Sequence, residues 1–387
     1  MRIIDIRETA VHLQSSVRNS LVDFSQMTVS VVAVVVDQKR NGRSLIGYGF
    51  DSIGRYAQGG LLRERFIPRL IDADPASLVD GEGSLDPKRI VQTMMRNEKP
   101  GGHGERSAAV AAVELAVWDL LAKERDVPLN VLIAERFNDG HYDERVDVYA
   151  AGGYYYPKEE PGRLRDEMTG YLDSGYTHLK MKIGGASMGE DMARIEEILE
   201  LVPDGGHLAV DANGRFDLDT SRAYGEAMSG YALRWYEEPG DPLDFGLHSE
   251  LAQYYKHPMA TGENLFSHQD VRNLVRYAGI RPDRDWLQMD PGLSYGLGEY
   301  VRMIDIIEAA GWSRRKVLPH GGHLMALHIA SGLGLGGNES YPGVFQPFGG
   351  FGNSVMVESG SVGLPDAPGA GLETKDELLP VLKELAE

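Results

Sequence analysis

Polar residues end a series of short apolar segments at nearly constant steps along the chain. In Leu208–Phe216, the apolar Leu208–Val210 leads to Asp211 and a turn at Asn213 and Gly214. Taking the segment ends Lys182, Asp211, Glu237, Glu263, Asp290 and His320, the steps are 29, 26, 26, 27 and 30 residues. One βα unit needs about 30 residues. The spacing therefore predicts parallel strands that each present a polar side chain at the same end.

The stretches between these strand ends have helical spacing of apolar residues. Helices are expected at 161–174, 191–201, 219–228, 244–255, 268–277 and 297–310. Strands alternating with helices predict a parallel sheet. Seven or more units between about 146 and 341 favour a closed, TIM-like (β/α)7β barrel. A doubly wound open sheet is the alternative, and polar strand ends all round the cycle favour closure.

The chain of 387 residues is longer than one barrel needs, which predicts two domains. Residues 1–130 lack the repeat; strands are expected at 1–11, 28–36 and 47–52, and helices at 61–71, 88–97 and 106–125. We expect 1–130 to form an α+β capping domain and 131–355 to form the barrel. The tail, 356–387, is expected to return to the cap.

Composition excludes several classes of function. A net charge of −19 argues against a nucleic-acid surface. The absence of cysteine excludes disulfides and thiol chemistry. No apolar run approaches the roughly 20 residues that span a bilayer, and the first residues follow a strand pattern instead of a signal peptide. We therefore expect a cytoplasmic protein that does not bind membranes.

Three acids end successive strands. Neighbouring strands lie about 4.8 Å apart, so Asp211, Glu237 and Glu263 can converge on one cation. Carboxylates without cysteine suit Mg²⁺. The alternative is that they are exposed loop residues, but crowded carboxylates repel one another unless a cation joins them. Glu238 should point away from Glu237, to a supporting or salt-bridged position.

Two lysines share one face of a strand. Lys180 and Lys182 lie two residues apart, about 6.6 Å along the strand. Their repulsion is about 2.5 kcal/mol at an effective dielectric near 20, which lowers the pKa of one lysine by about 1.8. Lys182 could then act as a base near neutral pH. The alternative is a pair of solvated lysines at the rim.

An acid and a histidine end the next two strands after Glu263. Asp290 can accept a hydrogen bond from one imidazole nitrogen of His320 and turn the other nitrogen toward the pocket. The strands of Lys182 and His320 lie across the barrel, so these two side chains should face a substrate from opposite sides. The alternative is an ordinary hydrogen-bonded histidine in a glycine-rich turn.

These motifs together resemble the mandelate racemase branch of the enolase superfamily. The resemblance rests on Lys-Met-Lys (180–182), Asp-Ala-Asn (211–213), Tyr-Glu-Glu-Pro (236–239), Gly-Glu-Asn (262–264), the strand-end Asp290 and Pro-His-Gly-Gly-His (319–323), and it covers nearly the whole chain. It implies Mg²⁺-dependent abstraction of the proton α to a carboxylate, at a barrel mouth closed by cap loops. Symmetric assemblies in this branch imply a homo-oligomer.

Within the branch, three segments resemble D-tartrate dehydratases. They are 97–106, 150–156 and 337–342. The resemblance implies a small hydroxy-acid substrate with two carboxylates, with Lys99 of the cap supplying charge for the second. Lys182 is expected to act as base, and His320, steadied by Asp290, as acid. The expected substrate contacts are Lys180, Lys99, Glu339, Asn19 and Tyr154.

Other interpretations stay open. The same site could dehydrate another acid sugar, or racemise a substrate with Lys182 and His320 as alternating bases. A barrel that only binds metal or anion would not need bases on both sides. Imine formation by Lys182 would be independent of metal.

Overall fold

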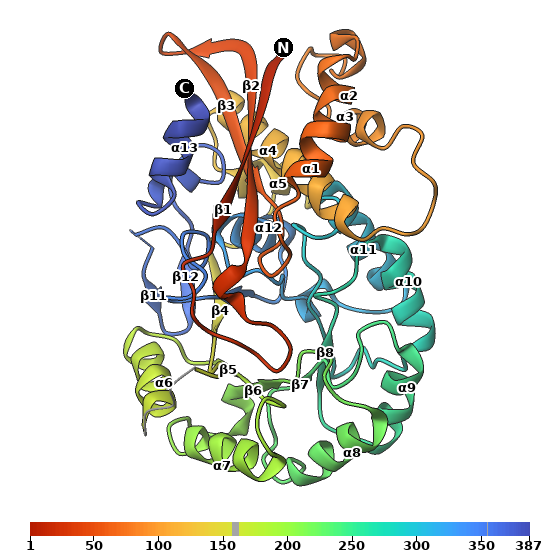
Figure 1. Ribbon diagram of the computed structural model, residues 1–387, viewed down its shortest axis with the longest axis vertical. Coiled ribbons are helices and arrows are strands. Elements are labelled where there is room, and N and C mark those ends of the chain that lie inside the picture. Colours follow the sequence, from red (N-terminus) through yellow and green to blue (C-terminus); the bar gives the residue numbers. More distant parts are fainter. Residues whose placement is uncertain (157–161, 354) are drawn as a thin grey trace.

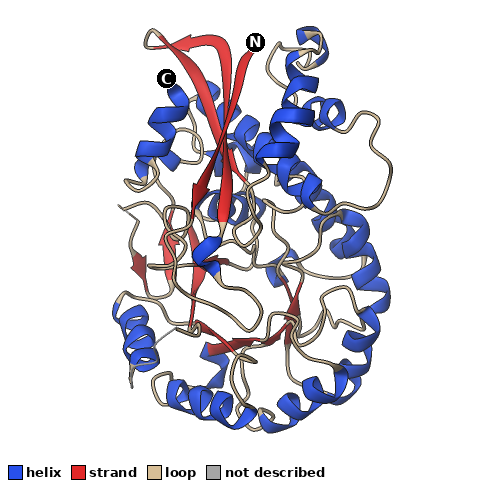
Figure 2. Ribbon diagram, viewed as in Figure 1, coloured by secondary structure: helices blue, strands red, loops and turns tan. Residues whose placement is uncertain are grey.

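The computed structural model describes residues 1–156, 162–353 and 355–387. The chain forms two parts, a cap and a barrel, as Figures 1 and 2 show. Residue 161, the expected first residue of a helix, lies outside the described residues. No helix among the described residues is long and apolar enough to cross a membrane.

The cap is built on a three-stranded antiparallel sheet in the order β1-β2-β3. Its strands are β1 (Ile3–His12), β2 (Thr28–Arg40) and β3 (Arg43–Phe50). The valine-rich run from Val29 to Val36 is buried throughout, because β-branched side chains pack well on a covered sheet. β1 and β3 flank it, with Ile6 and Gly47 both opposite Val34.

The cap also contains helices, of which α4 (Glu105–Arg125) packs against β2 and β3. The others are α1 (Gly59–Leu61), a π-helical turn (Leu62–Phe66), α2 (Ile67–Ile71), α3 (Pro87–Met94) and α5 (Leu129–Phe137). α4 packs against β3 through small residues: a Cβ atom at Gly47 would overlap the carbonyl of Ala116, and one at Gly49 would overlap that of Ala112. Close backbone approach therefore fixes α4 on the sheet.

The second part is a parallel barrel, which confirms the predicted fold class. Its strands, in order, are β4 (Arg145–Gly152), β5 (Leu179–Lys182), β6 (Leu208–Asp211), β7 (Tyr236–Glu237), β8 (Met259–Thr261), β9 (Trp286–Leu287) and β10 (Asn338–Ser340). β4 to β9 pair consecutively, and β10 pairs with β4. The register sets Lys182 opposite Asp211, and Asp211 opposite Glu237. Sheet pairing alone thus places these charged residues side by side.

The strand expected to end at His320 is the exception. Arg314–Lys316 form a 3-10 turn, and only Val317 bridges to Leu287 of β9. The carbonyl of Val317 accepts a hydrogen bond from Gly336 N, which continues the ring toward β10. A regular strand is interrupted here because Pro319 has no N–H to donate. The segment nevertheless occupies the position of the seventh barrel strand.

Helices surround the barrel strands (Figure 2). They are α6 (Arg163–Asp173), α7 (Met188–Leu199), α8 (Leu218–Ala227), α9 (Phe245–Tyr254), α10 (His268–Tyr277), α11 (Leu297–Ala309) and α12 (Leu324–Leu333). Ser187, Asp217, Asp244 and Ser267 cap the first turns of four of them. Such capping satisfies N–H groups that have no partner within the helix.

The tail contributes to both parts. β11 (Val357–Glu358) and β12 (Ser361–Gly363) form a hairpin, and β12 pairs antiparallel with β4. Farther on, α13 (Leu379–Ala386) packs against β1 and β2 of the cap. Tyr48 donates a hydrogen bond to the carbonyl of Leu382 at 3.3 Å. The return to the cap therefore begins only after the hairpin.

Cap and barrel are joined by polar contacts. Glu114 of α4 accepts hydrogen bonds from the N–H groups of Leu297 and Gly298, at the start of α11. The segment between β1 and β2 descends over the ends of β5 and β6 (Figure 1). There Ser20 donates to the carbonyl of Ala212 at 3.0 Å. The cap thus reaches the end of the barrel at which the strand-end charges lie.

Candidate active site

Three carboxylates gather at the ends of β6, β7 and β8, as the sequence predicts. Asp211, Glu237 and Glu263 each offer an oxygen, and these oxygens all lie within 4.8 Å of one another. Asp211 and Glu237 are fully buried, and the Glu263 side chain is 13% exposed. One ion could contact all three oxygens at this separation.

The carboxylates of this cluster repel one another. Burial, with Asp211 and Glu263 nearby, raises the pKa of Glu237 to about 8. Burial also acts to raise the pKa of Asp211, but Lys182 and Lys180 outweigh it and lower that pKa. A divalent cation would offset the repulsion, and three hard oxygen donors suit Mg²⁺. The residues present therefore fit that ion.

Lys182 lines the cavity beside these acids. Its ammonium donates a hydrogen bond to Asp211 Oδ2 and lies 5.2 Å from the ring centroid of Tyr154. Burial alone would lower the pKa of Lys182, but Asp211 and Tyr154 raise it above the ordinary value. Lys180 acts to lower the pKa of Lys182, as expected, but the attraction of Asp211 and Tyr154 outweighs this repulsion, so the net lowering predicted from the sequence does not occur.

Lys180 is held deeper in the barrel. Its ammonium lies 2.6 Å from Glu237 Oε1 and 2.7 Å from Glu339 Oε1, and its side chain is 1% exposed. The acids hold the pKa of Lys180 well above the usual range, against the effect of burial. Neither Lys180 nor Glu339 lines the cavity. Their contact with a substrate carboxylate stays a prediction.

His320 and Asp290 form the expected pair across the cavity from Lys182. His320 Nδ1 lies 2.9 Å from Asp290 Oδ2. Burial alone would lower the pKa of His320, but Glu263 and Asp290 raise it to about 10. The imidazole is therefore charged at neutral pH and can donate a proton.

Further groups hold this pair. Ser52, which follows β3 of the cap, donates to Asp290 Oδ2 at 2.6 Å, and Gly292 N donates to Oδ1 at 2.6 Å. The Tyr341 hydroxyl lies 2.9 Å from His320 Nε2. Asp290 is thus fully hydrogen-bonded, and both ring nitrogens of His320 have a partner.

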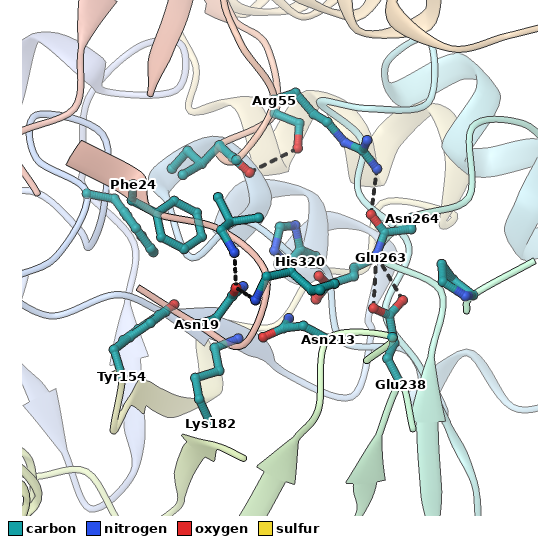
Figure 3. A pocket seen from close by; sticks show the side chains of 18 of the residues that line it. Asn19, Phe24, Arg55, Tyr154, Lys182, Asn213, Glu238, Glu263, Asn264 and His320 are labelled. Carbon is teal, nitrogen blue, oxygen red and sulfur yellow. Dashed lines mark hydrogen bonds and ion pairs between the residues drawn. The ribbon is translucent and has the colours of Figure 1, made fainter. Parts of the chain in front are cut away.

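A cavity of about 270 Å³ lies between cap and barrel. This volume is near the lower limit for ligand pockets and suits a small substrate. Figure 3 shows barrel residues Lys182, Glu263 and His320 together with Asn19 and Arg55 of the cap. The cap therefore supplies part of the wall, as the sequence predicts.

Of the remaining predicted substrate contacts, two line the cavity and one does not. Asn19 and Tyr154 line the cavity. Asn19 Oδ1 accepts hydrogen bonds from the N–H groups of Leu21 and Val22, so its side-chain oxygen stabilises its own loop. Lys99 is exposed, on the loop between α3 and α4, and does not line the cavity of the single chain. Its contact with substrate has no support in this geometry and stays a prediction.

Glu238 is not part of the three-acid cluster, as the sequence predicts, but it also lines the cavity. Its backbone is left-handed, with a φ of 36°, and turns the side chain out of the regular strand alternation. Both carboxylate oxygens accept from Asn264 Nδ2, at 3.0 and 2.9 Å. Asn264 Oδ1 in turn accepts from Arg55 at 2.5 Å. An amide therefore bridges an acid and a cap arginine.

The sequence did not reveal Ser52, Arg55 or Tyr341 as site residues. Ser52 and Arg55 directly follow a cap strand, and cap loops were expected to close the mouth. Tyr341 lies in the segment 337–342 that carries the D-tartrate dehydratase resemblance. Position supplied a signal in each case, but no residue pattern distinguished these side chains from ordinary loop residues.

Comparison with known proteins decides the family. Residues 163–378 match the family model "Enolase C-terminal domain-like", and residues 10–134 match "Mandelate racemase / muconate lactonizing enzyme, N-terminal domain". The chain belongs to the mandelate racemase/muconate lactonizing enzyme family. The resemblance to the enolase superfamily is thereby confirmed.

Several curated relatives act on sugar acids. Arabinonate dehydratase of Saccharolobus solfataricus is 27% identical, over 71% of this chain and 72% of that protein. The 3,6-anhydro-alpha-L-galactonate cycloisomerase of Streptomyces coelicolor is also 27% identical, over 93% and 92%. L-talarate/galactarate dehydratase of Salmonella typhimurium is 25% identical, over 80% and 73%.

Solved structures share the fold. A racemase from Streptomyces coelicolor with bound magnesium has a TM-score of 0.75 and 23% identity, and 99% of each chain is covered. L-Talarate dehydratase from Polaromonas sp. JS666, complexed with Mg and L-glucarate, has a TM-score of 0.74 and 22% identity, over 95% of this chain and 92% of that one. At this identity the likeness establishes the fold.

Proposed function

We propose that this protein is a Mg²⁺-dependent acid-sugar dehydratase, and that its substrate is D-tartrate, which it converts to oxaloacetate. The observation that carries the proposal is that Lys182 and His320 line one small cavity and lie at opposite ends of a three-acid cluster, Lys182 beside Asp211 and His320 beside Glu263. Relatives that dehydrate arabinonate and galactarate support the reaction class. The D-tartrate assignment rests on the resemblance of 97–106, 150–156 and 337–342.

Asp211, Glu237 and Glu263 would hold the ion. Bound there, Mg²⁺ would supply positive charge that acidifies the C–H group next to a substrate carboxylate. The same charge would lower the pKa of Lys182. Lys182 takes the α-proton, and the electron pair of the broken C–H bond forms the carbon–carbon double bond. Tyr154 and Asp211 keep the lysine ammonium at the cavity wall.

His320 completes the elimination. It gives its Nε2 proton to the hydroxyl on the β-carbon, so the C–O bond breaks and water leaves. Asp290 steadies the imidazole through Nδ1. The enol product takes up a proton to give the keto acid. One water leaves for each tartrate, which balances tartrate against oxaloacetate.

The test is a screen of the purified protein with Mg²⁺ against hydroxy-diacids and aldonic acids, with keto acids as the readout. D-tartrate should give oxaloacetate. Lys182→Ala and His320→Asn should each reduce the rate by about 10²–10⁴-fold, while one Mg²⁺ still binds. Near-full activity in either variant would contradict the assigned roles. Activity on another acid sugar alone would remove D-tartrate and keep the reaction class.

Racemisation is the second candidate, because Lys182 and His320 face the cavity from opposite sides. It needs no leaving group. Incubation in D₂O would then give α-deuterium exchange without keto acid.

A further inference from the structure

The cavity is lined by three cationic side chains, and one differs from the other two. Lys182 is paired with Asp211, and His320 with Asp290. Arg55 has a neutral partner, the amide oxygen of Asn264. Within the part of the chain that the structure describes, no carboxylate lies within ion-pair distance of its guanidinium.

Contacts with two barrel residues hold the Arg55 side chain in place. It lies in the cap segment after β3, three residues beyond Ser52, and its Cζ is 5.2 Å from the ring centroid of Phe266. Asn264 presents its oxygen to Arg55 and its nitrogen to Glu238, so the amide lies between the arginine and this acid. Figure 3 shows Arg55 reaching from the cap toward Asn264, Glu263 and Glu238.

A partly buried arginine with only a neutral partner is unusual in a chain with a net charge of −19. Its guanidinium carries five N–H donors in a planar fork that matches a carboxylate. One of them is used by Asn264. The remaining donors can bind an anion that enters the cavity.

We propose that Arg55 determines specificity for a dicarboxylate, by binding the substrate carboxylate that lies farther from Asp211, Glu237 and Glu263. This inference rests on the proposed function, in which the nearer carboxylate is the one next to the reacting C–H group. Arg55 enters from the cap, whereas the acids lie at the barrel strand ends. A dicarboxylate would therefore be held at both ends, and a monocarboxylate at one.

A purely structural role must be separated from this one, because Arg55 also links cap to barrel through Asn264. A structural clamp would affect every ligand equally. A carboxylate receptor would affect diacids alone. Paired ligands that differ only in the remote group distinguish the two roles.

The experiment measures binding by calorimetry with Mg²⁺ present, on a Lys182→Ala background that prevents turnover. The ligand pairs are D-tartrate with threonate, and galactarate with galactonate. In the second member of each pair a hydroxymethyl group replaces one carboxylate. Arg55→Gln and Arg55→Lys are compared with Arg272→Gln, whose guanidinium also bonds an amide oxygen, that of Gln269 on α10.

Arg55→Gln should weaken binding of at least one diacid by about 10- to 100-fold, the usual range for a charged hydrogen bond. Its monoacid partner should change by less than about threefold. Arg55→Lys should restore part of the diacid affinity, and Arg272→Gln should change nothing. Equal weakening of both members of a pair, no weakening, or no diacid binding to the Lys182→Ala parent would overturn the inference. Failure of the wild type to form oxaloacetate would instead count against the D-tartrate proposal.

Discussion

The barrel and the cap reach the same cavity by different means. At the barrel mouth, backbone pairing sets Lys182, Asp211 and Glu237 level with one another. The cap contributes through loops, which side-chain hydrogen bonds join to the barrel, such as those from Ser52 to Asp290 and from Arg55 to Asn264. We infer from this difference that barrel residues act as the base and the acid, whereas cap residues position Asp290 and determine which substrate binds.

The largest effect should come from loss of the ion, which depends on the barrel alone. Removal of Mg²⁺ by a chelator should abolish keto-acid formation, by at least about 10³-fold, because several kcal/mol of charge stabilisation is lost. Added Mg²⁺ should restore the rate. Asp211→Asn should behave like the chelated enzyme, whereas Asp217→Asn, at an exposed helix cap, should not. Full activity without a divalent ion would favour imine chemistry at Lys182.

A second effect concerns stability where α5, at the end of the cap, meets the barrel helix α12. Burial lowers the pKa of His328 to about 4, and its Nδ1 accepts a hydrogen bond from Asn130 N at 3.2 Å. The unfolded chain binds the proton near pH 6.5. The contribution of neutral His328 is therefore complete above about pH 6.5 and is lost as the pH falls toward 4, up to about 3 kcal/mol.

Urea unfolding between pH 4 and 7 measures this effect. His328→Gln should reduce the pH dependence of the free energy of unfolding, while His178, His248 and His323, whose pKa values burial also lowers to about 4, keep the remainder. An unaltered slope in His328→Gln would show that this histidine is not the titrating group.

A smaller effect tests whether the cap contributes to the chemistry at all. Ser52→Ala removes one hydrogen bond to Asp290, so the imidazole of His320 is held less firmly. We expect dehydration to fall by about tenfold, the equivalent of one hydrogen bond to a charged group. Exchange of the α-proton depends on Lys182 and should change little. Ser52→Thr should retain the rate. An equal fall in both reactions would indicate general damage to the cavity.

The smallest effect is expected at Asn19, whose side-chain oxygen already serves its own loop. Asn19→Ala should raise KM by about three- to tenfold, the cost of one neutral hydrogen bond, and leave kcat nearly unchanged. Asn19→Asp can keep the loop contacts and separates loop order from substrate contact. A fall in kcat larger than that of Ser52→Ala would reverse the proposed ranking of cap residues.

Much of the barrel site could be predicted because its polar residues end strands that recur at a regular spacing along the chain. Steps of 26 to 30 residues fix which strand end carries which group, and parallel register then brings Asp211, Glu237 and Glu263 together. The pairing of Asp290 with His320 follows from the same rule.

The cap residues could not be predicted in this way, because the cap loops contain no sequence repeat that shows which side chains reach the cavity. Lys99 lies on an exposed loop away from the cavity, whereas Arg55 lies in the wall. The pKa values of the two lysines could not be predicted from the sequence either, because they depend on which acids each ammonium contacts. Glu238 lines the cavity because its left-handed backbone breaks the strand alternation.

Deuterium exchange tests the central claim most directly. His320→Asn, incubated with D-tartrate and Mg²⁺ in D₂O, should incorporate deuterium at the α-carbon without releasing oxaloacetate, because Lys182 still removes the proton and the acid is missing. Lys182→Ala should show neither reaction. Exchange that persists in Lys182→Ala, or elimination that persists in His320→Asn, would contradict the assignment of base and acid to opposite sides of the three-acid cluster.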